Sequence, residues 1–264
     1  MPILNERGYL IPAVNNTSVD YIECAKLLAT SIKSFHPTAK ICLLTDKHID
    51  DSIFDYVKIL PHGDQSPNQE WKLNNDWQCF TASPFRQTIK LEADMIATSP
   101  IDHWWTVFEH RDLAISQGCR DFYGQLSKSR YYRKVFDSNN LPDVYNAITY
   151  WRVSQTAKEF FDLVRAIFSD WDSFKKLLKF PDDVPTTDLV YAMAANIVGV
   201  ENCILPTNFG PTIVHMKRHI IPTHTSDWSN ELIWENADPG LRIHTITQSG
   251  FFHYHIKDWA KTNE

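Results

Sequence analysis

Apolar residues in the first half of the chain gather into short runs separated by polar stretches. The run at 8–14 stops at Asn15, as a buried strand that leads into a polar loop would. Apolar residues then recur every three or four positions over 21–35, which predicts a helix with Ser18 as its cap. Further runs predict three strands, KICLLTD at 40–46, YVKIL at 56–60 and QTIKL at 87–91. This strand–helix–strand order favours a right-handed βαβ unit in an α/β fold.

The second half continues the alternation of predicted helices and strands. Residues 117–145 are polar, aromatic and irregular, and we expect them to cross over the edge of the sheet where ligands bind. Ser154 is the predicted cap of one helix, and a later helix begins at Thr187 and ends at Gly199. A short helix and two strands are predicted at 102–109, 112–116 and 147–153. Because no repeat or low-complexity linker interrupts the pattern, we expect one continuous domain over 1–264.

Composition and charge narrow the class of protein without naming a partner. A hydrophobic fraction of 43% is that of a globular protein, and a net charge of −6 argues against a basic surface that coats nucleic acid. The five cysteines are odd in number, scattered and free of CxxC pairs, which predicts a reducing compartment. No apolar run approaches the roughly 18 residues of a membrane helix, and the N-terminal apolar stretch is too short for a signal sequence. We therefore expect a soluble, cytoplasmic protein with no membrane partner.

Two carboxylates, Glu92 and Asp94, directly follow the predicted strand at 87–91. If the strand continues through them, side chains two positions apart point the same way, about 6–7 Å from each other. In open α/β sheets ligands bind at the carboxyl ends of the strands, and Asn15 stands at such an end too. The pair therefore predicts a site for a hard divalent cation, although acids in a solvated turn would give the same pattern.

The order of these features resembles the metal-dependent GT-A glycosyltransferases, and most closely glycosyltransferase family 8, the glycogenin-like enzymes. The segment YLIPAVNNTSVDYIECAKLLATSIK is similar to the family's opening strand, loop and helix, which implies that Asn15 and Tyr21 hold the nucleotide base. The segment SPFRQTIKLEADM is similar to the stretch that leads into the family's Asp-x-Asp motif, with Arg86 and Lys90 upstream and Arg86 as a donor contact. Glu92 then stands at the first acidic position, and Asp94 matches the second, the metal ligand.

Three later segments complete the resemblance. VYNAITYWR looks like the family's Asn-Ala/Ser-Gly strand, which implies that Asn146 lies beside the donor sugar or the acceptor. TTDLVYAM resembles the start of the Asp-Gln-Asp helix, which implies that Asp188 lies near the reacting carbon. FFHYHIKDW resembles the closing motif of the family, which implies His253 as the third metal ligand and Lys257 as a diphosphate contact.

Alternatives stay open for several of these residues. The closing segment is two residues shorter than the family motif and lacks its glycine, so His255 could replace His253 as the ligand. His215, in the segment IVHMK, is a further rival. A histidine within the aromatic run FFHYH could also simply be packed and hydrogen-bonded. Asp188 is an ordinary acid for a helix start, and Tyr21 could belong to the core.

A second resemblance concerns the acceptor. The segments HWW, YRKVFDSNNLPDVYNAITY and HMK are similar to glycosyltransferase-like proteins of large tailed bacteriophages. Some phage glycosyltransferases modify hydroxymethylated cytosine in DNA, which implies a DNA acceptor and, for a phage protein, the host cytoplasm. The stretch KSRYYRK at 128–134 interleaves cations with tyrosines, and with KRH at 217–219 it could form a nucleic-acid contact. A solvated loop or a lid over the donor diphosphate would also explain it.

The resemblance implies a fold, an activity and a cofactor. The fold class is α/β and GT-A-like, a Rossmann-type mixed sheet flanked by helices, with 1–116 as the nucleotide-sugar-binding half and 117–264 as the acceptor-binding half. The activity is transfer of a sugar from a UDP-linked donor, with retention at the anomeric carbon, to DNA, a glycan or a small molecule. The cofactor is Mn²⁺ or Mg²⁺, of which Mn²⁺ accepts imidazole more readily. A metal-dependent hydrolase of nucleotide sugars and a nonenzymatic nucleic-acid-binding protein are the alternative classes.

Overall fold

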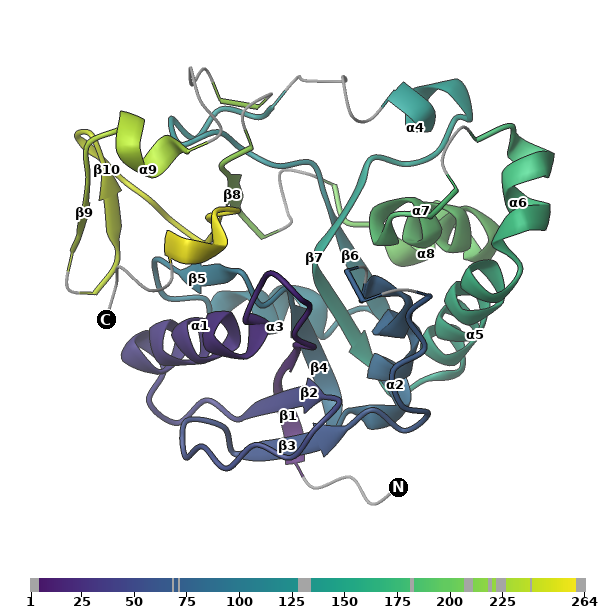
Figure 1. The fold of residues 1–264 in the computed structure, drawn as a ribbon, viewed down its shortest axis with the longest axis horizontal. Helices are drawn as coiled ribbons and strands as arrows, with labels where there is room; N and C mark the ends of the chain where they lie inside the picture. The colour runs from purple at the N-terminus through teal and green to yellow at the C-terminus, as the bar shows by residue number, and fades with distance from the viewer. Residues whose placement is uncertain are drawn as a thin grey trace.

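A six-stranded mixed sheet forms the framework of the protein, with the strand order β3-β2-β1-β4-β7-β6 (Figure 1). The computed structural model describes residues 5–67, 69–70, 72–127, 134–180, 183–206, 211–217, 220–221, 227–237 and 239–259. The strands of this sheet are β1 (Asn5–Pro12), β2 (Ile41–Thr45), β3 (Tyr56–Ile59), β4 (Phe85–Leu91), β6 (Leu113–Gln117) and β7 (Val144–Arg152). β1 runs parallel to β2 and β4, and β7 runs antiparallel to β4 and β6. The predicted βαβ unit and the mixed sheet are therefore confirmed.

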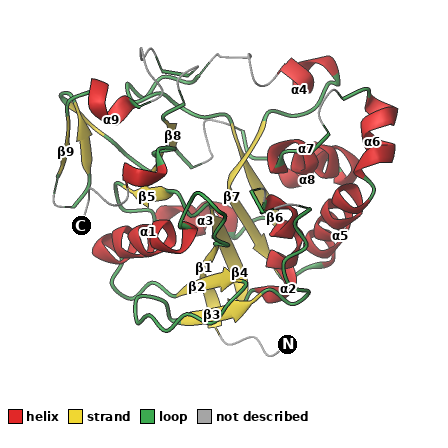
Figure 2. Ribbon diagram, viewed as in Figure 1, coloured by secondary structure: helices red, strands yellow, loops and turns green. Residues whose placement is uncertain are grey.

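Helices cover both faces of this sheet (Figure 2). On one face lie α1 (Tyr21–Phe35) and α3 (His103–Phe108), and on the other lie α2 (Cys79–Ala82), α5 (Gln155–Ser169) and α7 (Thr187–Val198). The remaining helical segments are η1 (Leu73–Gln78), α4 (Lys134–Ser138), α6 (Trp171–Leu178), α8 (Val200–Cys203) and α9 (Trp228–Glu231). Each face buries its own cluster of apolar side chains, so the sheet is covered on both sides.

The ends of the helices follow the capping chemistry of the sequence with one correction. Ser154 caps α5 as predicted, and α7 begins at Thr187 and ends before Gly199, whose φ is +109°. The cap of α1 is Asp20 instead of Ser18, because its carboxylate accepts hydrogen bonds from the first free backbone N–H groups of the helix. Ser18 lies two residues before this cap, and its backbone N–H donates a hydrogen bond to the side chain of Asn16.

Two small sheets consist mainly of strands from the C-terminal part of the chain. One has the order β5-β12-β8, with β5 (Met95–Ala97), β12 (Phe251–His253) and β8 (Ile213–His215). The other is antiparallel and consists of β9 (Trp234–Asn236), β10 (Leu241–Ile243) and β11 (Ile246–Thr247). Gly250 leads into β12 with a φ of +79°, and a Cβ there would lie 2.3 Å from the Thr212 carbonyl oxygen, so this approach requires glycine.

The cysteines and the helix lengths bear on the kind of protein that the sequence predicted. All five cysteines are buried and free, as the scattered spacing predicted. Among the helices that the structure describes, none combines the length and apolarity needed to cross a membrane.

Candidate functional site

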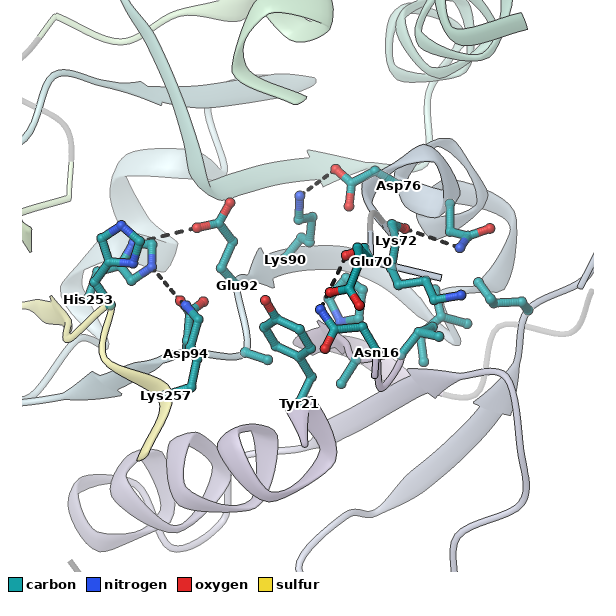
Figure 3. Close-up of a pocket in the computed structure, with 18 of the residues that line it drawn as sticks. Asn16, Tyr21, Glu70, Lys72, Asp76, Lys90, Glu92, Asp94, His253 and Lys257 are labelled. Carbon is teal, nitrogen blue, oxygen red and sulfur yellow. Dashed lines mark hydrogen bonds and ion pairs between the residues drawn. The ribbon is translucent and has the colours of Figure 1, made fainter. Parts of the chain in front are cut away.

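A cavity of about 460 Å³ opens at the carboxyl ends of β1 and β4 (Figure 3). Because β1 and β4 are parallel neighbours, their carboxyl ends meet at the same edge, as the sequence predicted. The start of α1, the segment before and within η1, the turn after β4 and the C-terminal segment complete the walls. The volume lies in the range of small-molecule binding sites in proteins, roughly 300–1,000 Å³.

The two acids lie in a turn and not in a strand. β4 ends at Leu91 and β5 begins at Met95, so Glu92 and Asp94 belong to the connection between them. The expectation that strand alternation aligns their side chains is therefore wrong. The pairing of β12 with β5 sets His253 opposite Met95 and so brings this histidine to the two acids.

The three side chains form a compact cluster. His253 Nε2 lies 2.7 Å from Asp94 Oδ2, and His253 Nδ1 lies 3.6 Å from Glu92 Oε2. One ligand atom from each residue lies within 4.8 Å of the others. Ligands about 2.1 Å from one ion stand within roughly 4.2 Å of each other, so this spread is close to a coordinating arrangement. Two carboxylates and one imidazole also suit Mn²⁺, so these residues fit the expected divalent cation.

The geometry favours His253 over the two rival histidines. Among the described residues that could hold a metal, only this histidine groups with two acids. His215 stacks on its ring at 4.7 Å between centroids, and His255 lies 5.8 Å from it with a left-handed φ of +65°. Burial lowers the pKa of His253 to about 4, against the opposing effect of Glu92, so the imidazole is neutral near pH 7. A neutral imidazole is the form that binds metal.

One hydrogen bond fixes the ring of this histidine. The Tyr145 hydroxyl lies 2.7 Å from His253 Nδ1, and Tyr145 is buried in β7. That contact holds Nε2 toward Asp94 and leaves it as the ligand atom.

Lys257 brings a positive charge to the same carboxylate. Its ammonium donates a hydrogen bond to Asp94 Oδ2 and lies 5.7 Å from the centre of the Tyr21 ring. Burial lowers the pKa of Lys257 to about 8, with Glu92 acting in the opposite direction. Because this pKa stays above 7, the lysine is mainly charged at neutral pH. A divalent cation at Asp94 would therefore compete with this ammonium.

Tyr21 and Asn16 line one side of the cavity, near the start of α1. Tyr21 is the first residue of α1, is half-buried and turns its ring into the cavity (Figure 3). Asn15 does not line the cavity, because its side chain bonds to Asp20 and to the backbone of Ile22 at the start of α1. Asn16 lines it instead.

Asn146 and Asp188 lie next to each other behind the cavity. The backbone N–H of Asn146 donates to Asp188 Oδ1 at 2.7 Å, and the Asn146 side chain donates to Asp76 Oδ2 at 3.1 Å. Neither residue is among those that line the cavity. The Asp188 carboxylate is still near enough to His253 to oppose part of the lowering of its pKa by burial.

The structure does not bring Arg86 to this group. It lies near the start of β4, roughly 20 Å along the chain from Glu92 at the other end of the strand. Its side chain is 63% exposed and faces Glu6.

Lys90, which lies upstream of the two acids in the sequence, forms a buried ion pair in the cavity that the sequence did not predict. Lys90 of β4 donates to Asp76 of η1 at 2.5 Å, and both residues line the cavity. Burial would lower the pKa of Lys90, but the Asp76 carboxylate outweighs it, so the pKa is raised and the lysine is charged. The signals in the sequence are a lysine between two apolar residues, Ile89 and Leu91, and the polar stretch NND at 74–76.

The fold is similar to that of known glycosyltransferases. The galactosyltransferase LgtC, crystallised with donor and acceptor sugar analogues, superposes with a TM-score of 0.52 and 10% identity over 94% of this chain and 86% of LgtC. The glycosyltransferase GlyE from Streptococcus pneumoniae TIGR4 superposes with a TM-score of 0.43 and 11% identity over 81% of this chain and 47% of GlyE. The bifunctional glycosyltransferase WbbM superposes with a TM-score of 0.46 and 9% identity over 80% of this chain and 40% of WbbM.

These comparisons establish the fold and nothing finer. The likeness to LgtC confirms the predicted GT-A-like fold class, a mixed sheet flanked by helices. No protein-family model matches the chain, and no curated protein matches it. The closer resemblance to family 8 and to phage proteins stays a prediction, as does the division into halves at residue 116.

Proposed function

We propose that this protein is a metal-dependent glycosyltransferase that moves a sugar from a nucleotide sugar, UDP-linked in the simplest case, to an acceptor. The observation that carries the proposal is the convergence of Glu92, Asp94 and His253 within 4.8 Å on the wall of a cavity of ligand size. Lys257 adds a cation and Tyr21 an aromatic ring in the same cavity. The GT-A-like fold supports this class of enzyme over an unrelated metal protein.

Each side chain has a role that its chemistry supports. When bound, the divalent cation neutralises the charge that develops on the leaving diphosphate. Glu92, Asp94 and His253 supply its ligand types. Lys257, which donates a hydrogen bond to Asp94, would exchange this partner for a diphosphate oxygen when the donor binds. The Tyr21 ring offers an apolar face to a nucleotide base.

Asn146 and Asp188 complete the proposed catalytic group. Asp188 orients the backbone of Asn146 through their hydrogen bond, and its negative charge would stabilise positive charge that builds up on the sugar ring. The family 8 resemblance implies that the configuration at the anomeric carbon is retained.

Two classes of acceptor are proposed for the transferred sugar. Hydroxymethylated cytosine in DNA is the first candidate, and a glycan or small molecule is the second. Most of the basic segment that suggested DNA lies outside the described residues, at 128–133, as do 218–219. Lys134, at the end of that segment, is exposed.

A thermal-melt screen tests the donor site. Wild type, Asp94→Ala and the control Asp162→Ala, which removes an exposed acid on α5, are melted with UDP, GDP, CDP or ADP, with and without Mn²⁺. A nucleotide at 100 times its Kd adds about 2.7 kcal/mol, which raises the Tm by roughly 5–10 °C. We expect a rise that needs both UDP and Mn²⁺, persists in Asp162→Ala and disappears in Asp94→Ala.

Other outcomes would redirect the assignment. If no nucleotide raises the Tm of wild type, the donor-site proposal is wrong. If a nucleotide sugar binds but is consumed fully by water without any acceptor, the protein is a hydrolase that uses the same residues.

A further inference from the structure

The Lys90–Asp76 ion pair is buried in the wall of the cavity. Lys90 is 1% exposed and Asp76 is 6% exposed, yet both line the cavity (Figure 3). Among the other lining residues, Asn16 is half-buried and Glu70 is exposed. A charged pair this far from water needs an explanation, because burying charges is costly even when they are paired.

The pair is held rigidly through one oxygen. Asp76 Oδ2 accepts hydrogen bonds from Lys90 Nζ at 2.5 Å, Asn146 Nδ2 at 3.1 Å and the Tyr191 hydroxyl at 2.8 Å. These donors come from β4, β7 and α7, so three elements of the core fix the carboxylate.

The rest of the pair keeps hydrogen-bonding capacity. Within the described part of the chain, the other oxygen, Asp76 Oδ1, has only the Cys79 thiol at 4.0 Å as a side-chain partner. Lys90 has three N–H donors, and the hydrogen bond to Asp76 is the one found among the described residues. The pair therefore combines spare donors with a spare acceptor in the wall of the cavity. A sugar hydroxyl is both a donor and an acceptor and can use the two together.

The position of the pair relative to the acid cluster points to the sugar part of the donor. Lys90 precedes Glu92 by two residues on nearly extended backbone, so their Cα atoms are about 6–7 Å apart. A diphosphate held at the cluster would carry the sugar on one side and the nucleoside on the other. The sugar end is where water must be excluded, and Lys90 and Asp76 are both buried.

We propose that Lys90 and Asp76 bind hydroxyl groups of the transferred sugar and set which sugar donor the protein accepts. The inference rests on the proposed function, because it assigns a specificity role within the same donor site. A purely structural role, in which the pair only joins η1 to the sheet, is the competing explanation.

Comparing a nucleotide with its sugar conjugate separates these explanations. The Kd values for UDP, UDP-glucose, UDP-galactose and UDP-N-acetylglucosamine are measured with Mn²⁺ for wild type and Lys90→Met. The double variant Lys90→Met/Asp76→Asn is included because it removes both charges and leaves no unpaired one. Lys158→Met, which removes an exposed lysine paired with Asp162, is the matched control.

We expect the variants at the pair to lose about tenfold or more in affinity for the preferred UDP-sugar, while their affinity for UDP changes less than about twofold. Lys158→Met should change neither. An equal loss for UDP and UDP-sugar, or no loss in folded variants, would overturn the inference and leave the donor site intact. If wild type binds no nucleotide at all, the proposed function fails first and the inference fails with it. Should both variants fail to fold, the same ratio is measured in Tyr191→Phe, which withdraws a single hydrogen bond from Asp76, and an unchanged ratio counts against the inference.

Discussion

Two lysine–aspartate pairs lie in the same cavity, and they differ in how the protein holds them. The Lys90 and Asp76 side chains are 2% and 7% exposed, and the pair is fixed by partners from β7 and α7. The Lys257 side chain is 21% exposed, and Asp94 is held by Lys257 and His253, both from the C-terminal segment. The Lys90–Asp76 pair is part of the core and is called the core pair below. The Lys257–Asp94 pair depends on one late segment of the chain and is called the adaptable pair.

The pKa values of the two lysines shift in opposite directions. Burial is the largest influence on the pKa of both residues and acts to lower it. For Lys90 the carboxylate of Asp76 reverses the effect and raises the pKa, but the pKa of Lys257 falls to about 8. We therefore expect the Lys90–Asp76 pair to stay intact when a ligand binds. The Lys257–Asp94 pair is expected to separate, so that Asp94 binds the cation and Lys257 binds the diphosphate.

The largest expected difference is in stability. Lys90→Met leaves Asp76 buried without its cation, which should lower the free energy of unfolding by about 3–5 kcal/mol. Lys257→Met makes the same chemical change where the lysine is more exposed and Asp94 keeps its contact with His253, so it should cost less, about 1–2 kcal/mol. Urea unfolding of both variants against wild type measures the two losses. Similar losses in the two variants would remove the contrast between a core pair and an adaptable pair.

A second difference concerns the histidines that surround the adaptable pair. His253→Ala removes a proposed ligand and should weaken Mn²⁺ binding roughly 100-fold, about 2.7 kcal/mol. His255→Ala changes a cavity residue outside the three-residue cluster and should weaken it less than about threefold. Titration of Mn²⁺ into each variant gives the two affinities. The reverse order would make His255 the ligand and would require a different turn after β12.

The smallest expected effect has opposite signs for the two ligands. Lys257→Met removes a cation that competes at Asp94, so Mn²⁺ alone should bind about three- to tenfold more tightly. The same variant loses a proposed diphosphate contact, so UDP with Mn²⁺ should bind about tenfold more weakly. Direct titration of both ligands checks the two signs. Weaker binding of Mn²⁺ alone would mean that Lys257 supports the metal site and does not compete with it.

Local patterns in the sequence predicted the framework well. The period of apolar residues over 21–35 gave the bounds of α1, because a half-buried helix must repeat its apolar side every three or four residues. The same holds for Ser154 as a cap and for the meeting of β1 and β4 at one edge. These features depend on interactions between residues close in sequence or on the general rules of parallel sheets.

The parts of the site that depend on distant contacts were harder to predict. His253 reaches Asp94, 159 residues earlier, only through the pairing of β12 with β5. Asp76 gains its partners from residues 70 and 115 positions later, and nothing local marks that contact. Whether Asn15 or Asn16 enters the cavity depends on one turn at the start of α1.

Arg86 is a different case, because its placement could have been foreseen. Five residues of strand, 87–91, separate it from Glu92, so simple strand geometry already sets Arg86 near one end of β4 and Glu92 just beyond the other. The family resemblance alone suggested it as a donor contact.

The central claim is that Asp94 and its neighbours hold a cation that binds the diphosphate of the donor. Calorimetric titration of UDP tests it most directly, in Mn²⁺ and then in EDTA, for wild type and Asp94→Ala. We predict that UDP binds wild type in Mn²⁺, and that EDTA or Asp94→Ala each weakens this binding by about 100-fold, roughly 2.7 kcal/mol. Equal UDP affinity in Mn²⁺ and EDTA, or unchanged affinity in Asp94→Ala, would contradict the claim.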